Sequence, residues 1–147
     1  MAKVILGKRP SHVRSIVTAT LPNGEVGRIE ARYRYRTRTE YGEMIDKRLA
    51  DARAESEAAE EQYKADVAKA QQDGQEPPAR QTLTVAELER RTRDANAAYL
   101  LDNLVGWDLD AELTMESLQS LCDEAPAMAQ ALIDGYRAAI IEGRLGN

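Results

Sequence analysis

The fold is decided by residues 12–38, which read HVRSIVTATLPNGEVGRIEARYRYRTR. The second half of this stretch alternates between two kinds of side chain, as a half-buried β-strand does. One set is apolar, aromatic or hydroxyl-bearing: Ile29, Ala31, Tyr33, Tyr35 and Thr37. The other set is charged: Arg28, Glu30, Arg32, Arg34, Arg36 and Arg38. The pattern predicts a strand with one packed face and one face in water.

The first half of the stretch predicts the partner strand, and Leu21-Pro22-Asn23-Gly24 predicts the turn between the two. Proline fixes φ at the first central turn position, and Asn and Gly tolerate the right- and left-handed helical angles that reverse the chain. Because two strands alone are marginally stable, the hairpin must pack on helices or on another strand. Residues 3–7 are the candidate for a third strand.

A long, polar helical region follows. Thr39 is placed to cap a helix whose first turns carry apolar residues at helical spacing, but beyond about residue 50 the sequence becomes rich in Ala and in charged pairs such as Glu60 with Lys64. Gly74 and the two prolines at 77–78 interrupt the helix, and a capping box at Thr84-Val85-Ala86-Glu87 restarts it. We therefore expect two antiparallel helices that project as a polar hairpin arm.

The last third predicts a compact helical part. A helix ends near Val105 with Gly106 closing it, Thr114 caps a short helix, and Pro126 begins a final helix that Gly143 ends. The expected fold is α+β and mostly helical, with the hairpin packed on a C-terminal helical bundle. Its expected parts are residues 1–48 (hairpin and start of the first long helix), 49–96 (polar arm) and 97–147 (compact helical part), all within one domain.

The composition gives no support for catalysis, a cofactor or a metal. The chain of 147 residues holds one Cys (Cys122) and one His (His12), too few for a disulfide framework or a structural zinc site. Acidic residues alternate at 108, 110 and 112, but they lack the glycine and the distal Glu of the known calcium loop. No apolar run reaches the length of a membrane span, so we expect a soluble cytoplasmic protein that is not an enzyme.

Charge is unevenly distributed along the chain. Residues 1–48 carry a net charge of +6 and residues 49–147 carry −11. Such a basic front and acidic rear permit intramolecular attraction or head-to-tail self-association, or each is simply a solvated surface. The arginines of residues 28–38 likewise have three interpretations: a solvated face, a surface for an acidic protein partner, or a nucleic-acid surface. The tyrosines lie on the opposite strand face, so bases would find no aromatic platform among the arginines.

A Gly-Trp-acidic turn at 106–108, a helix that begins with Pro126, and the terminus Arg144-Leu145-Gly146-Asn147 occur in this order in the C-terminal third. A Lys-rich start and a basic two-strand unit with a Pro-Asn-Gly turn precede them. Over about residues 1–48 and 97–147 the chain resembles the phage tail assembly chaperones. The arm at 50–96 is not part of this resemblance.

The resemblance implies a protein of the host cell cytoplasm that is absent from the mature virion. It would bind the tape-measure protein, keep that protein soluble and bring tail-tube subunits to it. A binder of apolar helices needs an apolar groove with charged surroundings. The candidate partner-binding residues are Trp107, Leu109, Leu113, Tyr136, Arg32, Arg34 and Arg36.

Two alternatives to this interpretation stay open. The four apolar candidates could all belong to the core, where Trp and Tyr at helical turns usually pack. The protein could also be a structural tail component, or a nucleic-acid-binding regulator that uses the arginine strand.

Overall fold

A computed structural model of the chain describes residues 1–146. Its contacts form two compact units, one made of residues 1–38 together with those from Ala86 onward, and the other of Thr39–Val85. The units divide at other positions than the boundaries expected after residues 48 and 96. Each unit is described by itself below.

The predicted hairpin is confirmed. Strand β1 (His12–Thr20) pairs antiparallel with β2 (Val26–Arg34), with Ser15 opposite Ala31. The turn between them closes with a hydrogen bond of 2.8 Å from the Gly24 N–H to the Leu21 carbonyl, and Gly24 has a φ of 86°. A left-handed angle of this kind is why the turn needs glycine.

The third strand is not the predicted one. Residues 3–7 form no strand, and β3 (Leu104–Trp107) completes an antiparallel sheet of order β1-β2-β3. The expectation that Gly106 closes a helix is wrong for the same reason, because Gly106 pairs with Arg32 of β2. Val105, which is β-branched, and Gly106 are both poor helix formers, and the chain pairs with β2 on either side of Val105 instead of continuing the helix.

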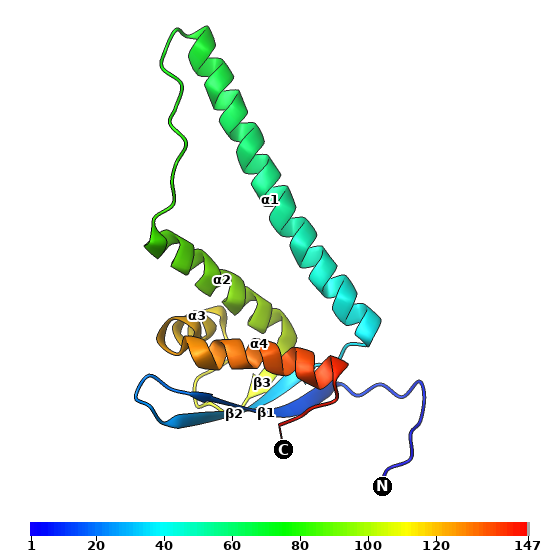
Figure 1. Cartoon of the computed structure of the whole chain (residues 1–147). Helices are drawn as coiled ribbons and strands as arrows, with labels where there is room; N and C mark the ends of the chain where they lie inside the picture. The colour runs from blue at the N-terminus through cyan, green and yellow to red at the C-terminus, as the bar shows by residue number, and fades with distance from the viewer. Residues whose placement is uncertain (147) are drawn as a thin grey trace. The chain divides into compact units, whose positions relative to one another are not determined.

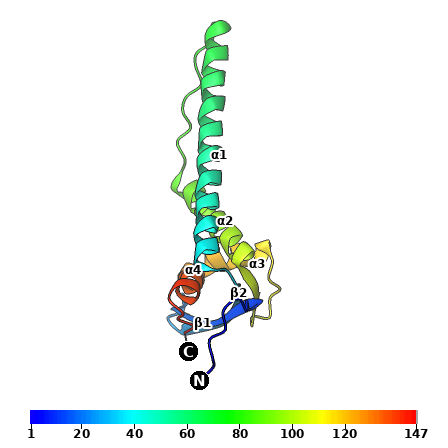
Figure 2. The same ribbon diagram turned by 90° about the vertical axis from the view of Figure 1, so that its right-hand side faces the viewer.

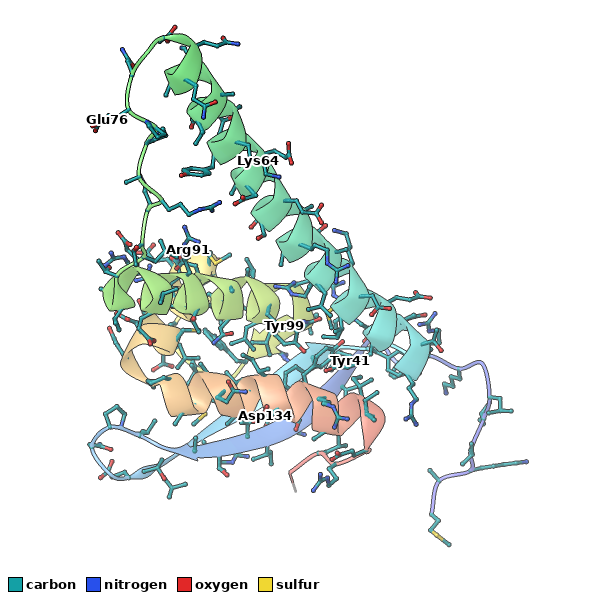
Figure 3. All side chains as sticks on the ribbon, turned by 45° about the horizontal axis from the view of Figure 1, so that its top comes forward. Tyr41, Lys64, Glu76, Arg91, Tyr99 and Asp134 are labelled. Carbon is teal, nitrogen blue, oxygen red and sulfur yellow. The ribbon has the colours of Figure 1, made fainter. Side chains whose placement is uncertain are left out.

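Three helices complete the first unit: α2 (Val85–Asn103), α3 (Met115–Glu124) and α4 (Pro126–Ile141). Helix α4 lies across one face of the sheet (Figure 1), where the Tyr33 hydroxyl donates a 2.7 Å hydrogen bond to the Leu132 carbonyl. The ring of Tyr136 on α4 lies 5.1 Å from that of Tyr33 and 6.5 Å from that of Tyr99, which α2 directs toward α4 (Figure 3). These three tyrosines join sheet, α4 and α2 into one core.

The predicted ends of the last two helices are confirmed. Thr114 caps α3 in a capping box, with its hydroxyl accepting from the Ser117 N–H and the Ser117 hydroxyl accepting from the Thr114 N–H. Pro126 occupies the first turn of α4, and Gly143, with a φ of 64°, follows the helix. Beyond it, the Leu145 carbonyl accepts a 2.8 Å hydrogen bond from the Ile16 N–H, so the C-terminal residues cover part of the outer edge of β1.

The second unit consists mainly of one long helix, α1 (Arg38–Gln72), which Figures 1 and 2 show as uninterrupted. It begins at Arg38, so Thr39 lies inside its first turn and does not precede it as predicted. The helix ends in a Schellman motif: Gly74 has a φ of 66°, its N–H bonds to the Gln71 carbonyl, and the Gln75 N–H bonds to the Ala70 carbonyl at 2.9 Å.

The break predicted between the two helices of the arm is confirmed. Residues 73–84 contain no helix, and α2 begins at Val85, directly after Thr84 as the capping box predicts. Arg80 holds this extended segment to α1 by two 2.9 Å hydrogen bonds to the Glu60 carboxylate and by a position 4.3 Å above the Tyr63 ring. The paired prolines keep this segment extended, and the arm is helical again from Val85 onward.

Candidate partner-binding surface

The sheet has an outer face, turned away from α4, that carries most of the predicted arginines. Alternation along the strands directs Ile29, Ala31 and Tyr33 toward α4, where they are buried, and their neighbours to the outer side. Arg14 of β1 lies directly opposite Arg32 of β2 in the register. We call the exposed outer arginines the arginine face; its members are Arg14, Arg28, Arg32 and Arg34.

Two of these arginines are neutralised by carboxylates. The Arg14 guanidinium contacts Glu30 at 2.6 Å, and its hydrogen bond holds the pKa of that carboxyl below its usual range. Arg28 lies 3.7 Å from Asp108, whose other oxygen accepts a 2.9 Å hydrogen bond from the Glu30 N–H. These contacts fix the turn after β3 against the outer side of the sheet.

The other two arginines keep their charge without a carboxylate beside it. Within residues 1–146 no ion pair is described for Arg32 or Arg34, and Arg34 bonds instead to the Asp102 backbone carbonyl at 3.0 Å. A Cβ added to Gly106 would lie 2.2 Å from the Arg32 guanidinium, so the glycine lets Arg32 lie flat across β3. Arg32 and Arg34 are thus the members of the arginine face whose positive charge is not compensated by a neighbouring carboxylate of the described residues.

Arg36, the third predicted arginine, does not join the arginine face. Its side chain is 19% exposed, and its guanidinium contacts Asp102 at 3.4 Å and the Asn103 side-chain oxygen at 3.2 Å. Asn103 is itself buried and donates to the Tyr99 carbonyl. Arg36 therefore connects the chain after β2 to the end of α2, which is a structural position.

Three of the apolar candidates, Trp107, Leu109 and Leu113, lie at the end of β3 and in the segment that follows it. The Trp107 indole N–H donates a 2.7 Å hydrogen bond to the Ala111 carbonyl, which closes the turn at 108–111. Within that turn Leu109 is 37% exposed, while Trp107 and Leu113 on either side are half-buried. Leu109 is thus the exposed member of the apolar candidates.

Tyr136 lies in the core. It has no exposed surface, and its hydroxyl donates a 2.9 Å hydrogen bond to the Arg34 carbonyl. Burial raises the pKa of Tyr136 above its usual value, which keeps the hydroxyl protonated as a donor. The Tyr136 side chain contacts the end of β2 from the α4 side of the sheet and does not reach the surface.

Sequence reasoning missed the exposed apolar side chains outside the last helices. Leu101 and Val105 are exposed on either side of the α2–β3 junction, and the N-terminal residues Val4, Ile5 and Leu6 are exposed as well. The exposure of Val105 was not predicted because Val105 was assigned to a helix. The exposure of the N-terminal apolar residues was not predicted because residues 3–7 were assigned to a third strand. The flanking Lys3 and Lys8 were the available signal, since charges at both ends of a short apolar run are typical of an exposed segment.

The groups considered for other chemistry are placed as follows. Cys122 is buried in α3, and burial raises the pKa of its thiol, which keeps it neutral. His12 is exposed at the start of β1, with Nδ1 3.0 Å from the Ser11 hydroxyl. In the part of the chain that the structure describes, no group of three His, Cys, Asp or Glu side chains could hold a metal ion. None of the helices described is both long and apolar enough to cross a bilayer.

The fold and surface define a small α+β protein that exposes an arginine face and, after β3, a turn with the exposed apolar side chain of Leu109. A family model described as phage tail assembly chaperone matches residues 1–147, and the chain therefore belongs to the phage tail assembly chaperone family. The match also includes the arm at 49–96, which the resemblance noted from the sequence did not cover. Membership gives the chain a role in tail assembly within the host cell. No curated protein and no solved structure matches the chain.

Proposed function

We propose that this chain binds the tape-measure protein in the host cytoplasm, keeps it soluble, brings tail-tube subunits to it, and leaves before the particle is complete. Membership of the family along the entire chain is the observation that carries this proposal. A long helical protein with an apolar stripe aggregates unless the stripe is covered, and an exposed apolar side chain with charged surroundings suits such a stripe.

We infer that the turn after β3 makes the apolar contact. Leu109 is exposed there, and the turn is rigid because Trp107 bonds to Ala111 and Asp108 bonds to Glu30. A rigid contact residue loses little conformational freedom on binding. Arg32 and Arg34 lie on the outer face of the same sheet and would attract acidic residues that flank an apolar stripe.

The test is co-expression of the chain with a fragment of the tape-measure protein encoded in the same phage. We expect the intact chain to keep the fragment in the soluble fraction and Leu109→Glu to lose this effect. Leu88→Glu is the matched control, because Leu88 is also exposed but lies near the start of α2 and not on the sheet. Equal solubilisation by both variants would contradict the assignment of Leu109. Trp107→Ala is a poorer test, because it removes the hydrogen bond that closes the turn.

Absence from the virion needs a separate measurement. Mass spectrometry of purified particles is expected to find tape-measure and tube proteins and not this chain. Its detection there at a stoichiometry similar to that of a tail protein would support the alternative, a structural tail component, and would overturn this part of the proposal.

A further inference from the structure

The N-terminal segment is the most exposed apolar part of the molecule. Val4, Ile5 and Leu6 are 84%, 61% and 92% exposed, and no secondary structure is formed by residues 1–5. Figures 1 and 2 show the segment leaving β1 and extending away from the sheet. Val and Ile favour the extended conformation of a strand, so this segment has the composition of a strand but has no partner strand.

The sheet offers an edge for such a strand. β3 is the last strand in the order β1-β2-β3, and Val105 on it is 46% exposed. An edge strand presents unpaired backbone groups that can pair with another extended segment. At the opposite edge, the C-terminal residues already occupy part of β1 through the bond from Ile16 to Leu145. β3 is therefore the better available edge.

The charges on the two segments are complementary. Lys3 and Lys8 flank the apolar residues of the N-terminal segment on both sides. Asp102 precedes β3, and Asp108 and Asp110 follow it. Asp102 already contacts Arg36 and Asp108 already contacts Arg28, but their side chains remain 47% and 43% exposed. When the three apolar residues pair along the four residues of β3, a lysine lies near an aspartate at each end, in either strand direction.

We propose that the N-terminal segment of one copy, residues 3–8, adds as a fourth strand to the β3 edge of a second copy. A second copy is favoured over the same chain for two reasons. The segment departs from β1, at the opposite side of the sheet from β3, and Arg9 holds its base 5.5 Å from the Tyr35 ring at the end of β2. Each copy has one N-terminal segment and one β3 edge. Two copies can therefore exchange segments and form a closed dimer, or each copy can bind the next and form an open chain of copies.

The first test measures self-association by light scattering and analytical ultracentrifugation. The intact chain is expected to associate, and Ile5→Glu is expected to weaken association at least about tenfold. Ile5 is 61% exposed and lies outside every strand and helix, so this substitution is expected to leave the fold unchanged, which circular dichroism would verify. Leu88→Glu is again the control, with a Leu-to-Glu change at an exposed apolar position on α2, outside both segments. A monomeric intact chain, or equal association by the two variants, overturns the proposal.

The second test locates the contact with cysteines in a Cys122→Ala background. One batch carries Leu6→Cys and another Val105→Cys, and mild oxidation of the mixture is expected to form a disulfide between the two batches. Leu49→Cys on α1 replaces Val105→Cys as the exposed apolar control and is expected to cross-link much less. A further variant carries both Leu6→Cys and Val105→Cys in one chain. If it forms a disulfide within single chains while the mixed batches form none, the β3 edge pairs with the segment of the same chain and the proposal is overturned.

This inference is independent of the tape-measure assignment. Ile5→Glu is expected to keep the tape-measure fragment soluble, whereas Leu109→Glu is expected to keep self-association. If Leu109→Glu alone failed in both assays, the contact between copies would lie at the turn and the N-terminal segment would have no part in it.

Discussion

At the scale of single residues, Tyr33 shows how one side chain connects the sheet to its covering helix. Its ring lies on the face predicted to pack, it has no exposed surface, and its hydroxyl bonds to the Leu132 carbonyl of α4. A buried hydroxyl without a partner is costly, so this bond also fixes where α4 lies on the sheet. Desolvation raises the pKa of Tyr33 well above its ordinary value of about 10.

Tyr33→Phe is expected to lower the free energy of unfolding by about 1 kcal/mol, because it removes a buried hydrogen bond. In the intact chain the native state keeps the Tyr33 proton at a pH where the unfolded state loses it. Stability should therefore fall as the pH rises above about 10, and less steeply in the variant. Urea unfolding at several pH values measures both effects. Tyr35→Phe, at a half-buried position, is the control, and an equal loss in both variants would contradict the assignment.

At the scale of elements, the segment after α1 is held by side chains and not by a helix of its own. Arg80 pairs with Glu60 and lies over Tyr63, whose hydroxyl donates a 3.2 Å hydrogen bond to the Pro78 carbonyl. Glu60 was expected to pair with Lys64, but Lys64 pairs with Glu61 at 3.6 Å. The hydrogen bond from Arg80 lowers the pKa of the Glu60 carboxyl, as a direct ion pair should.

Arg80→Ala is expected to free residues 75–84 without unfolding the rest of the chain. Exposed ion pairs add little to global stability, so the unfolding midpoint should hardly change. Hydrogen exchange in residues 75–84 should become faster, and cleavage by protease in this segment should increase. Arg91→Ala, an exposed arginine on α2, is the control. Unchanged exchange in Arg80→Ala would show that the prolines alone keep the segment in place.

At the scale of the whole molecule, the two units have different origins of stability. The first contains almost all of the buried apolar side chains, whereas α1 in the second buries only Met44 and Ala70. A deletion of the arm should therefore follow the unit boundaries and remove residues 39–85. A cut from 52 to 95 would take away half of α2.

The first unit is expected to fold without residues 39–85 when a linker joins Arg38 to Ala86. Arg36 contacts Asn103 at the end of α2, and Ala86 lies 17 residues before it, about 26 Å along the helix. A long Gly/Ser linker of about 12 residues spans this distance, and a direct fusion of Arg38 to Ala86 does not. We expect cooperative unfolding with a loss of less than about 2 kcal/mol for the long linker only.

If the long-linker variant still keeps the tape-measure fragment soluble, the arm acts as a spacer. Loss of that effect in a variant that folds would instead place a partner contact on the arm. A long-linker variant that does not fold would show that the first unit depends on the second.

The sequence by itself determined the elements whose signals are local. Alternation along residues 28–37 and the turn at Pro22-Asn23-Gly24 predict the hairpin, and the residues Thr114, Pro126 and Gly143 predict the ends of α3 and α4. A cap, a turn or an alternating face depends on residues a few positions apart, so its physics is contained in a short stretch of chain.

Only the tertiary structure decided what depends on distant partners. Leu104–Trp107 became a strand because β2 was there to pair with it, and Tyr136 became core because Tyr33 and Arg34 surround it. The Arg36 guanidinium bonds to Asn103, 67 positions away in the sequence, and Arg36 is therefore not part of the arginine face. These outcomes are set by the free energy of pairing and burial between segments far apart in the chain, which no local pattern records.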